Sequence, residues 1–116
     1  MQAALRKAIS ELEDGLVIID NGSERRVESG FIDITARDMA GAIVVIELKA
    51  GPAGPRAVAQ ILSYMGDVTM DDPDSKVRGI LVASDFDRKA KAAARVVPSL
   101  ALHAYKVRFQ FSIVDD

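Results

Sequence analysis

Residues 30–50 read GFIDITARDMAGAIVVIELKA, and this stretch decides the fold class. Its two ends are rich in β-branched residues, which favour strands, and Arg37–Gly41 between them has the polar and glycine residues of a turn. We therefore predict a β-hairpin formed by Gly30–Ala36 and Ala42–Ala50. The second strand is apolar at every position through Ile46, as expected of a strand buried on both faces.

Helices and strands are expected on both sides of this hairpin. An apolar stripe at helical spacing predicts a helix before it, and GPAGP leads into a second helix with proline in its first turn. The remaining predicted elements are, in chain order, a helix over Gln2–Asp14, a strand over Leu16–Asp20, a helix over Pro55–Val68, a strand over Val77–Ser84, a helix over Asp85–Val97, and one strand or a bent pair over Leu102–Ile113. The order α-β-β-β-α-β-α-β predicts an α/β fold in one domain over residues 1–116, with a central mixed β-sheet flanked by helices.

The composition restricts the chemistry that this chain can perform. The 116 residues include no cysteine and a single histidine, which excludes thiolate zinc sites, iron–sulfur clusters and multi-histidine metal sites. The longest apolar run, Ala42–Ile46, is far shorter than the ~20 residues that span a membrane. We expect a soluble, cytoplasmic protein without a membrane segment, whose chemistry uses carboxylates, lysine, arginine, hydroxyls or backbone groups.

Three charged residues interrupt the apolar pattern of the hairpin. Glu47 and Lys49 share one face of the second strand because side chains alternate along a strand, and Asp33 lies on the strand that should pair with it. Charges at the end of a buried strand are costly unless they are paired or bound to a metal. One interpretation is a buried ion-pair network. The other is a site for Mg²⁺, which prefers one or two carboxylates together with water and phosphate oxygens.

The context of these residues favours the metal site. The arrangement GFID, followed 14 residues later by ELK, resembles the PD-(D/E)XK nuclease superfamily. In QILSY, Gln60 and Tyr64 lie on one helix face and are similar to the helix that completes the active site of RecB-like nucleases. The segments VESGFIDITARDMAGAIVVIELKAG, AVAQILSYMGDV and VRGILVAS resemble the nuclease domain of NucS (EndoMS) endonucleases, and the likeness covers nearly the whole chain.

This resemblance implies a restriction-endonuclease-like sandwich and a role for each motif residue. Asp33 and Glu47 would be metal ligands, together with the backbone carbonyl of Leu48, and Lys49 would be the catalytic lysine. Gln60 and Tyr64 would support the site. A further ligand is expected from the first helix, for which Glu13 is the better candidate and Glu28 the weaker one. The implied cofactor is Mg²⁺, with Mn²⁺ able to substitute.

A basic stretch supplies candidate DNA contacts. Residues 88–108 contain six basic residues and no acidic residue, and Arg88, Lys91 and Arg95 share one helix face. Arg56 lies on the side of Gln60. Such cations would bind the phosphate backbone in a salt-dependent way and would not read the sequence. The alternative interpretation is an ordinary solvated helix face.

Together these features predict a Mg²⁺-dependent DNA endonuclease that acts on flaps, mismatches or junctions in repair or recombination. NucS-type proteins carry a separate N-terminal DNA-binding domain, for which this chain has no room, so we expect a homodimer or a recruiting protein. One alternative is a DNA-binding or assembly module that keeps the nuclease fold without turnover. Another is a metal-dependent hydrolase that acts on RNA or nucleotides.

Overall fold

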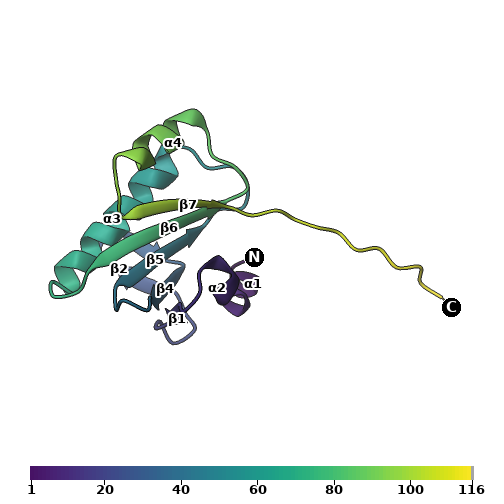
Figure 1. Ribbon diagram of the computed structural model, residues 1–116, viewed down its shortest axis with the longest axis horizontal. Helices are drawn as coiled ribbons and strands as arrows, with labels where there is room; N and C mark the ends of the chain where they lie inside the picture. Colours follow the sequence, from purple (N-terminus) through teal and green to yellow (C-terminus); the bar gives the residue numbers. More distant parts are fainter. Residues whose placement is uncertain (116) are drawn as a thin grey trace.

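The computed structural model describes residues 1–115 and contains a mixed five-stranded sheet with helices on both faces (Figure 1). The strand order is β1-β4-β5-β6-β7, which confirms the predicted α/β fold class. The strands of this sheet are β1 (Val17–Ile18), β4 (Ile34–Arg37), β5 (Ile43–Leu48), β6 (Val77–Ala83) and β7 (Leu100–Ala104).

The predicted hairpin forms the centre of the sheet. β4 and β5 pair antiparallel with Ile34 opposite Ile46, and Asp38 and Gly41 close the turn between them. β6 then pairs parallel to β5, with Leu81 beside Glu47. Because parallel neighbours need a crossover connection, the chain passes from β5 to β6 through helix α3 (Pro55–Asp71). β5 is therefore a central strand, as its apolar run predicted.

The sheet separates two hydrophobic layers. Ile43 and Val45 face α3 and helix α4 (Arg88–Arg95), whereas Val44 and Ile46 face α1 (Gln2–Lys7) and α2 (Ile9–Leu12). Figure 1 shows the two pairs of helices on opposite sides of the sheet. Since side chains alternate along β5, Glu47 points to the α3 side, toward the same layer as Val45.

Several predicted elements differ from the observed ones at their ends. The first helix divides at Ala8, where the backbone leaves helical geometry, and its second part ends at Leu12 instead of Asp14. α4 begins at Arg88 instead of Asp85, because the Asp87 side chain accepts a hydrogen bond from the Ala90 N–H at 2.8 Å and caps the helix. α3 extends past Val68 to Asp71.

Two differences affect the interpretation of function. The expected strand Gly30–Ala36 is broken at Asp33, and its first part, β3 (Gly30–Ile32), pairs with β2 (Arg25–Val27) in a separate two-stranded sheet. The expected strand Leu102–Ile113 is regular only through Ala104, and the chain then runs away from the sheet without a partner strand (Figure 1). Among residues 1–115, no helix has the length and apolar character needed to cross a bilayer.

Candidate active site

Asp33 and Glu47 are held together by hydrogen bonds from backbone N–H groups to their carboxylates. The Asp33 N–H donates to Glu47 Oε1 at 2.8 Å, and the Leu48 N–H donates to Asp33 Oδ2 at 2.9 Å. Each carboxylate therefore accepts a main-chain N–H from the segment that carries the other carboxylate. The break at Asp33 leaves its N–H free for this contact, because neither β3 nor β4 includes the residue.

Burial gives these two carboxylates unusual proton affinity. Glu47 is only 4% exposed, and burial raises its pKa to about 7, with the charge of Asp33 acting in the same direction. The pKa of Asp33 is also raised, mainly by burial, against the hydrogen bond from Leu48. Two buried carboxylates in contact repel each other, and a bound cation would relieve that repulsion.

Lys49 continues the same face of β5 and reaches α3. Its Nζ donates to Gln60 Oε1 at 2.5 Å, so the helix fixes the position of the lysine amine. Lys49, Gln60 and Arg56 line a pocket of about 300 Å³ that also includes Pro52 and Gly54. The structure thus brings Arg56 beside Lys49 and Gln60, with its own side chain exposed.

Tyr64 closes the site from the α3 side. It is buried, and burial followed by the charges of Glu47 and Asp33 raises its pKa. The ring packs against Gly30, where a Cβ atom would lie only 2.9 Å from the tyrosine oxygen. Gly30 also has a φ of 147°, which L side chains rarely adopt. Tyr64 therefore belongs both to the core and to the surroundings of the carboxylates.

Glu13 and Glu28 are not placed with the carboxylates. Glu13 makes a salt bridge with Arg78, whose Nε donates to Asp38 at 2.9 Å. Arg78 lies on β6 two residues before Ile80, so it faces the α1–α2 side of the sheet, opposite to Glu47. The expectation for Glu13 is corrected by the structure: the start of α1, at Gln2 and Arg6, contacts Asp33, whereas Glu13 follows the far end of α2.

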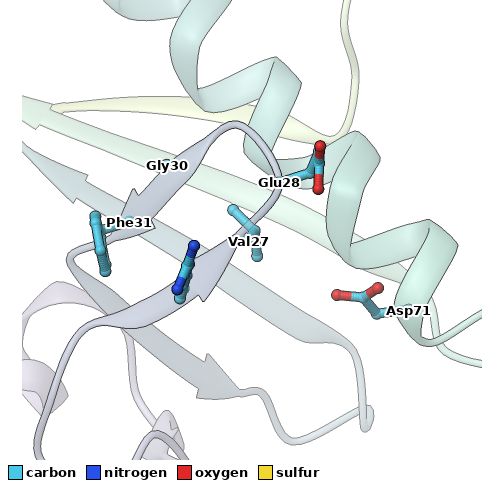
Figure 2. Close-up of a pocket in the computed structure, with 6 residues that line it drawn as sticks. Val27, Glu28, Gly30, Phe31 and Asp71 are labelled. Atoms are coloured by element: carbon cyan, nitrogen blue, oxygen red, sulfur yellow. The ribbon is translucent and has the colours of Figure 1, made fainter.

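Glu28 lines a different hollow, formed by the β2–β3 hairpin and the end of α3. This hollow has a volume of about 560 Å³ and is larger than the Lys49 pocket. Glu28 and Asp71 lie along it (Figure 2). Its lining includes Val27 and Phe31 but neither Asp33 nor Lys49. The weaker candidate for a further ligand is therefore also displaced from the site.

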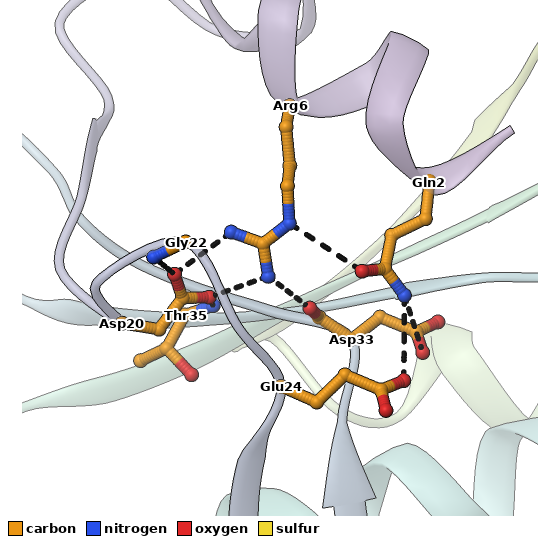
Figure 3. Close-up of polar contacts among 7 residues, drawn as sticks. All are labelled: Gln2, Arg6, Asp20, Gly22, Glu24, Asp33 and Thr35. Carbon is orange, nitrogen blue, oxygen red and sulfur yellow. Dashed lines mark hydrogen bonds and ion pairs between the residues drawn. The ribbon is translucent and has the colours of Figure 1, made fainter.

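Two polar residues beside Asp33 have no counterpart in the sequence analysis. Gln2 Nε2 donates to Glu24 Oε2 at 3.3 Å and to Asp33 Oδ1 at 3.4 Å (Figure 3). The negative charge of Glu24 contributes to the raised pKa of Asp33. Glu24 lies in a stretch that reads as a turn, so no strand or helix pattern pointed to it. Gln2 and Arg6 are four residues apart on α1, and this spacing is the only sequence signal for the cluster.

Arg6 and Asp20 form an ion pair that holds the main chain around Asp33. The Arg6 guanidinium donates to both oxygens of Asp20, at 2.8 and 2.9 Å, and to the Asp33 carbonyl oxygen at 2.7 Å (Figure 3). Asp20 also accepts the N–H groups of Thr35 and Gly22, each at 3.0 Å. Burial alone would raise the pKa of Asp20, but these hydrogen bonds outweigh it and the pKa is lowered. The pair thus fixes the backbone from Asp33 to Thr35, where β4 begins.

The basic face of α4 is exposed. Arg88, Lys91 and Arg95 all point to solvent. The start of α4 is attached to the loop before α3, because the Ala53 N–H donates to the Asp85 carbonyl at 2.9 Å and the Asp87 N–H donates to the Ala53 carbonyl at 3.2 Å. Arg88 therefore follows directly from the backbone that borders the Lys49 pocket.

The donor set suits a hard divalent cation. Within residues 1–115, no three acidic or histidine side chains are grouped as metal ligands. Asp33 and Glu47 supply two carboxylates, and Leu48 is the residue whose N–H ties Asp33 to β5. Two carboxylates plus a backbone oxygen leave positions for water and substrate oxygens, as Mg²⁺ prefers. The pKa values of both acids are raised because burial outweighs the opposing charge of Lys49.

The chain belongs to the family described as "Endonuclease NucS C-terminal domain", whose model matches residues 1–98. It is 41% identical over 68 residues to the endonuclease NucS of Thermococcus kodakarensis, which covers 59% of this chain and 27% of that protein. It is 33% identical over 96 residues to endonuclease NucS 1 of Halobacterium salinarum, covering 78% of this chain and 39% of that protein. The chain thus spans less than half of the length of these two relatives.

Two solved structures share the fold over most of the chain. One is a complex of EndoMS with double-stranded DNA, with a TM-score of 0.80 and 28% identity, covering 93% of this chain and 44% of the other. The second is a repair endonuclease from Pyrococcus abyssi, with a TM-score of 0.77 and 29% identity, covering 91% of this chain and 47% of the other. The structural likeness therefore includes the sheet and both helical layers described above.

Proposed function

We propose that this chain is a Mg²⁺-dependent DNA endonuclease domain of the PD-(D/E)XK type, which hydrolyses phosphodiester bonds. The observation that supports this most is the fixed pair of carboxylates, Asp33 and Glu47. Lys49 follows Glu47 by two residues, and its charge lowers the pKa of both acids. The names of its relatives, which are endonucleases, support the same class of activity.

Asp33, Glu47 and the backbone carbonyl of Leu48 would hold Mg²⁺, or Mn²⁺ in its place. When bound, the metal supplies a water of lowered pKa and polarises the phosphoryl oxygen. Glu47 must give up its proton to act as a ligand, because its pKa of about 7 leaves it partly protonated near neutrality. Asp33 and Glu47 are already fixed by backbone hydrogen bonds, so binding requires little rearrangement.

Lys49 would orient the attacking water and stabilise the negative charge that develops on the phosphate. The hydrogen bond to Gln60 keeps its amine directed toward the pocket, so Gln60 is a positioning residue. Tyr64 excludes water from the α3 side of the carboxylates and, by its burial, keeps their surroundings of low polarity.

DNA would approach along the face that carries Arg56 and the exposed cations of α4, namely Arg88, Lys91 and Arg95. One structural relative was solved with double-stranded DNA and another is named a repair endonuclease. We therefore propose a substrate with a structural feature, such as a flap, mismatch or junction, in DNA repair or recombination. The cations would add affinity for the backbone without reading its sequence.

The test is a cleavage assay of the purified protein with Mg²⁺ or Mn²⁺ on labelled single-stranded, flapped, mismatched, four-way and plain duplex DNA. We expect cleavage to fall at least ~100-fold in Glu47→Ala and in Lys49→Ala, because each removes a group that acts on the developing charge. Glu28→Ala is the matched control, since it removes the same charge from an exposed position outside the site.

Binding of Mn²⁺ separates the two roles. Glu47→Ala should lose the metal, whereas Lys49→Ala should retain it and lose only turnover. Full cleavage by Glu47→Ala would overturn the proposed site. DNA binding by the wild type without cleavage of any substrate would instead support a non-catalytic module that keeps the fold.

A further inference from the structure

The C-terminal segment has the pattern of a strand but lacks a partner within residues 1–115. Tyr105 is anchored to the body, since its hydroxyl accepts the Gly51 N–H at 3.0 Å and its N–H donates to the Ala83 carbonyl at 3.0 Å. Beyond it the chain extends away from the sheet (Figure 1). Apolar and polar residues then alternate strictly: Val107, Phe109, Phe111 and Ile113 against Lys106, Arg108, Gln110 and Ser112.

The apolar side of this segment is almost fully exposed. Val107 is 65% exposed, Phe109 76%, and Phe111 and Ile113 at least 90%. The rings of Phe109 and Phe111 stack on the same side, with centroids 6.2 Å apart. Alternation with period two is the signature of a strand with one buried face, so these residues are suited to a sheet that this copy alone does not complete.

The apolar positions of the segment are symmetric about Gln110, whereas its polar positions are not. Reading outward from this residue, Phe109 corresponds to Phe111, Arg108 to Ser112, and Val107 to Ile113. Two copies in antiparallel register around Gln110 would therefore place phenylalanine opposite phenylalanine and one β-branched residue opposite another. Such cross-strand pairs stabilise a sheet, and all apolar side chains would emerge on one face.

We propose that residues 105–113 form an antiparallel strand pair with the same segment of a second copy of this chain. The two-fold axis passes through Gln110. Pairing satisfies the exposed N–H and C=O groups of both segments and gathers eight apolar side chains into one stripe. This inference concerns assembly and does not depend on the proposed cleavage activity.

An apolar groove at the base of the segment provides cover for that stripe. The groove has a volume of about 400 Å³ and lies between α1 and the sheet, where its lining includes Leu5, Leu48, Val82 and Val107. In the proposed register Ile113 of the second copy lies opposite Val107, which places it at this groove. The cover matters because a two-stranded pair alone is only marginally stable in water.

The absence of cysteine from the sequence allows a direct test of the register. In Gln110→Cys the two thiols would face each other across the axis, with Cα atoms ~5 Å apart, within the range that a disulfide bridges. Ser112→Cys is the matched control on the same polar face. Its two copies would lie about 13 Å apart along the strands, too far for a disulfide.

Under mild oxidation at micromolar concentration, we expect Gln110→Cys to crosslink at least ~10-fold faster than Ser112→Cys, because only the first pair meets the disulfide distance. Equal rates for the two variants would overturn the register. In sedimentation equilibrium the wild type should dimerise, and the double variant Phe109→Ser with Phe111→Ser should remain monomeric with an unchanged circular dichroism spectrum. A wild type that stays monomeric at all concentrations would overturn the proposal.

Discussion

Asp20 and Glu47 are both buried carboxylates beside the strand break at Asp33, yet their protonation behaviour is opposite. Asp20 accepts two hydrogen bonds from Arg6 and two from backbone N–H groups, and its pKa is lowered. Glu47 accepts one backbone N–H and faces a second carboxylate, and its pKa is raised to about 7. Asp20 thus has its cation within the chain, whereas Glu47 is the carboxylate for which we propose a bound Mg²⁺.

Removing Arg6, the cation that pairs with Asp20, should have the largest effect on stability. Arg6→Ala leaves Asp20 buried with its charge unpaired, which costs about 3 to 5 kcal/mol for pairs of this kind. The free energy of unfolding, measured by urea denaturation at pH 7, should fall by this amount.

Arg25→Ala is the control for that measurement, because Arg25 bonds to Asp72 at 3.2 Å at a partly exposed site. Its loss should cost at most about 1 kcal/mol. Equal losses for the two variants would mean that the Arg6–Asp20 pair is no more than a surface contact.

The pH dependence of stability should show that Glu47, unlike Asp20, has a raised pKa in the folded protein. Since its pKa is raised from 4.5 to about 7, the folded state holds a proton that the unfolded state has released. Its contribution therefore makes the protein less stable as pH rises from about 4.5 to 7, by at most about 3 kcal/mol.

Glu47→Gln keeps the oxygen that accepts the Asp33 N–H and removes the titration. The wild type should therefore lose stability relative to the variant between pH 4.5 and 7. Above pH 7 the difference between their free energies of unfolding should stay constant. A constant difference across this range would contradict the raised pKa. Asp20 does not obscure the result, because its lowered pKa places its loss of stability at more acidic pH.

Addition of Mg²⁺ should stabilise the folded protein by a smaller amount, and only when the carboxylate of Glu47 is present. At pH 7.5 a ligand present at ten times its Kd stabilises the folded state by about 1.4 kcal/mol. The melting temperature of the wild type should rise accordingly, and that of Glu47→Gln should not. A rise of equal size in both proteins would place the cation elsewhere.

The sequence was sufficient to predict the sheet and the proximity of Asp33 to Glu47, because both depend on local periodicity. The hairpin around Arg37–Gly41 and the central position of β5 follow from an apolar run and a turn. The contact between Lys49 and Gln60 follows from a strand face and a helix that are close in the chain. For these elements the spacing of residues determines which side chains can meet.

The missed features depend on contacts between distant segments. Arg6 reaches Asp20 and the Asp33 carbonyl, and Arg78 reaches Glu13 across 65 residues, and no periodic pattern encodes either partner. The break at Asp33 was hidden because GFIDITA alternates as one strand would, although its two halves join different sheets. Glu13 was misplaced because helical spacing cannot show which end of the helical segment lies at Asp33.

The close contact between Gly30 and Tyr64 has a consequence for how this sequence can vary. A Cβ at position 30 would collide with the tyrosine hydroxyl, and the positive φ there disfavours other residues in any case. Positions 30 and 64, which are 34 residues apart, are thus constrained as a pair. A larger residue at position 30 fits this fold only if a smaller residue replaces Tyr64 and the backbone at position 30 changes. A single substitution at either position therefore disturbs the present arrangement of the site.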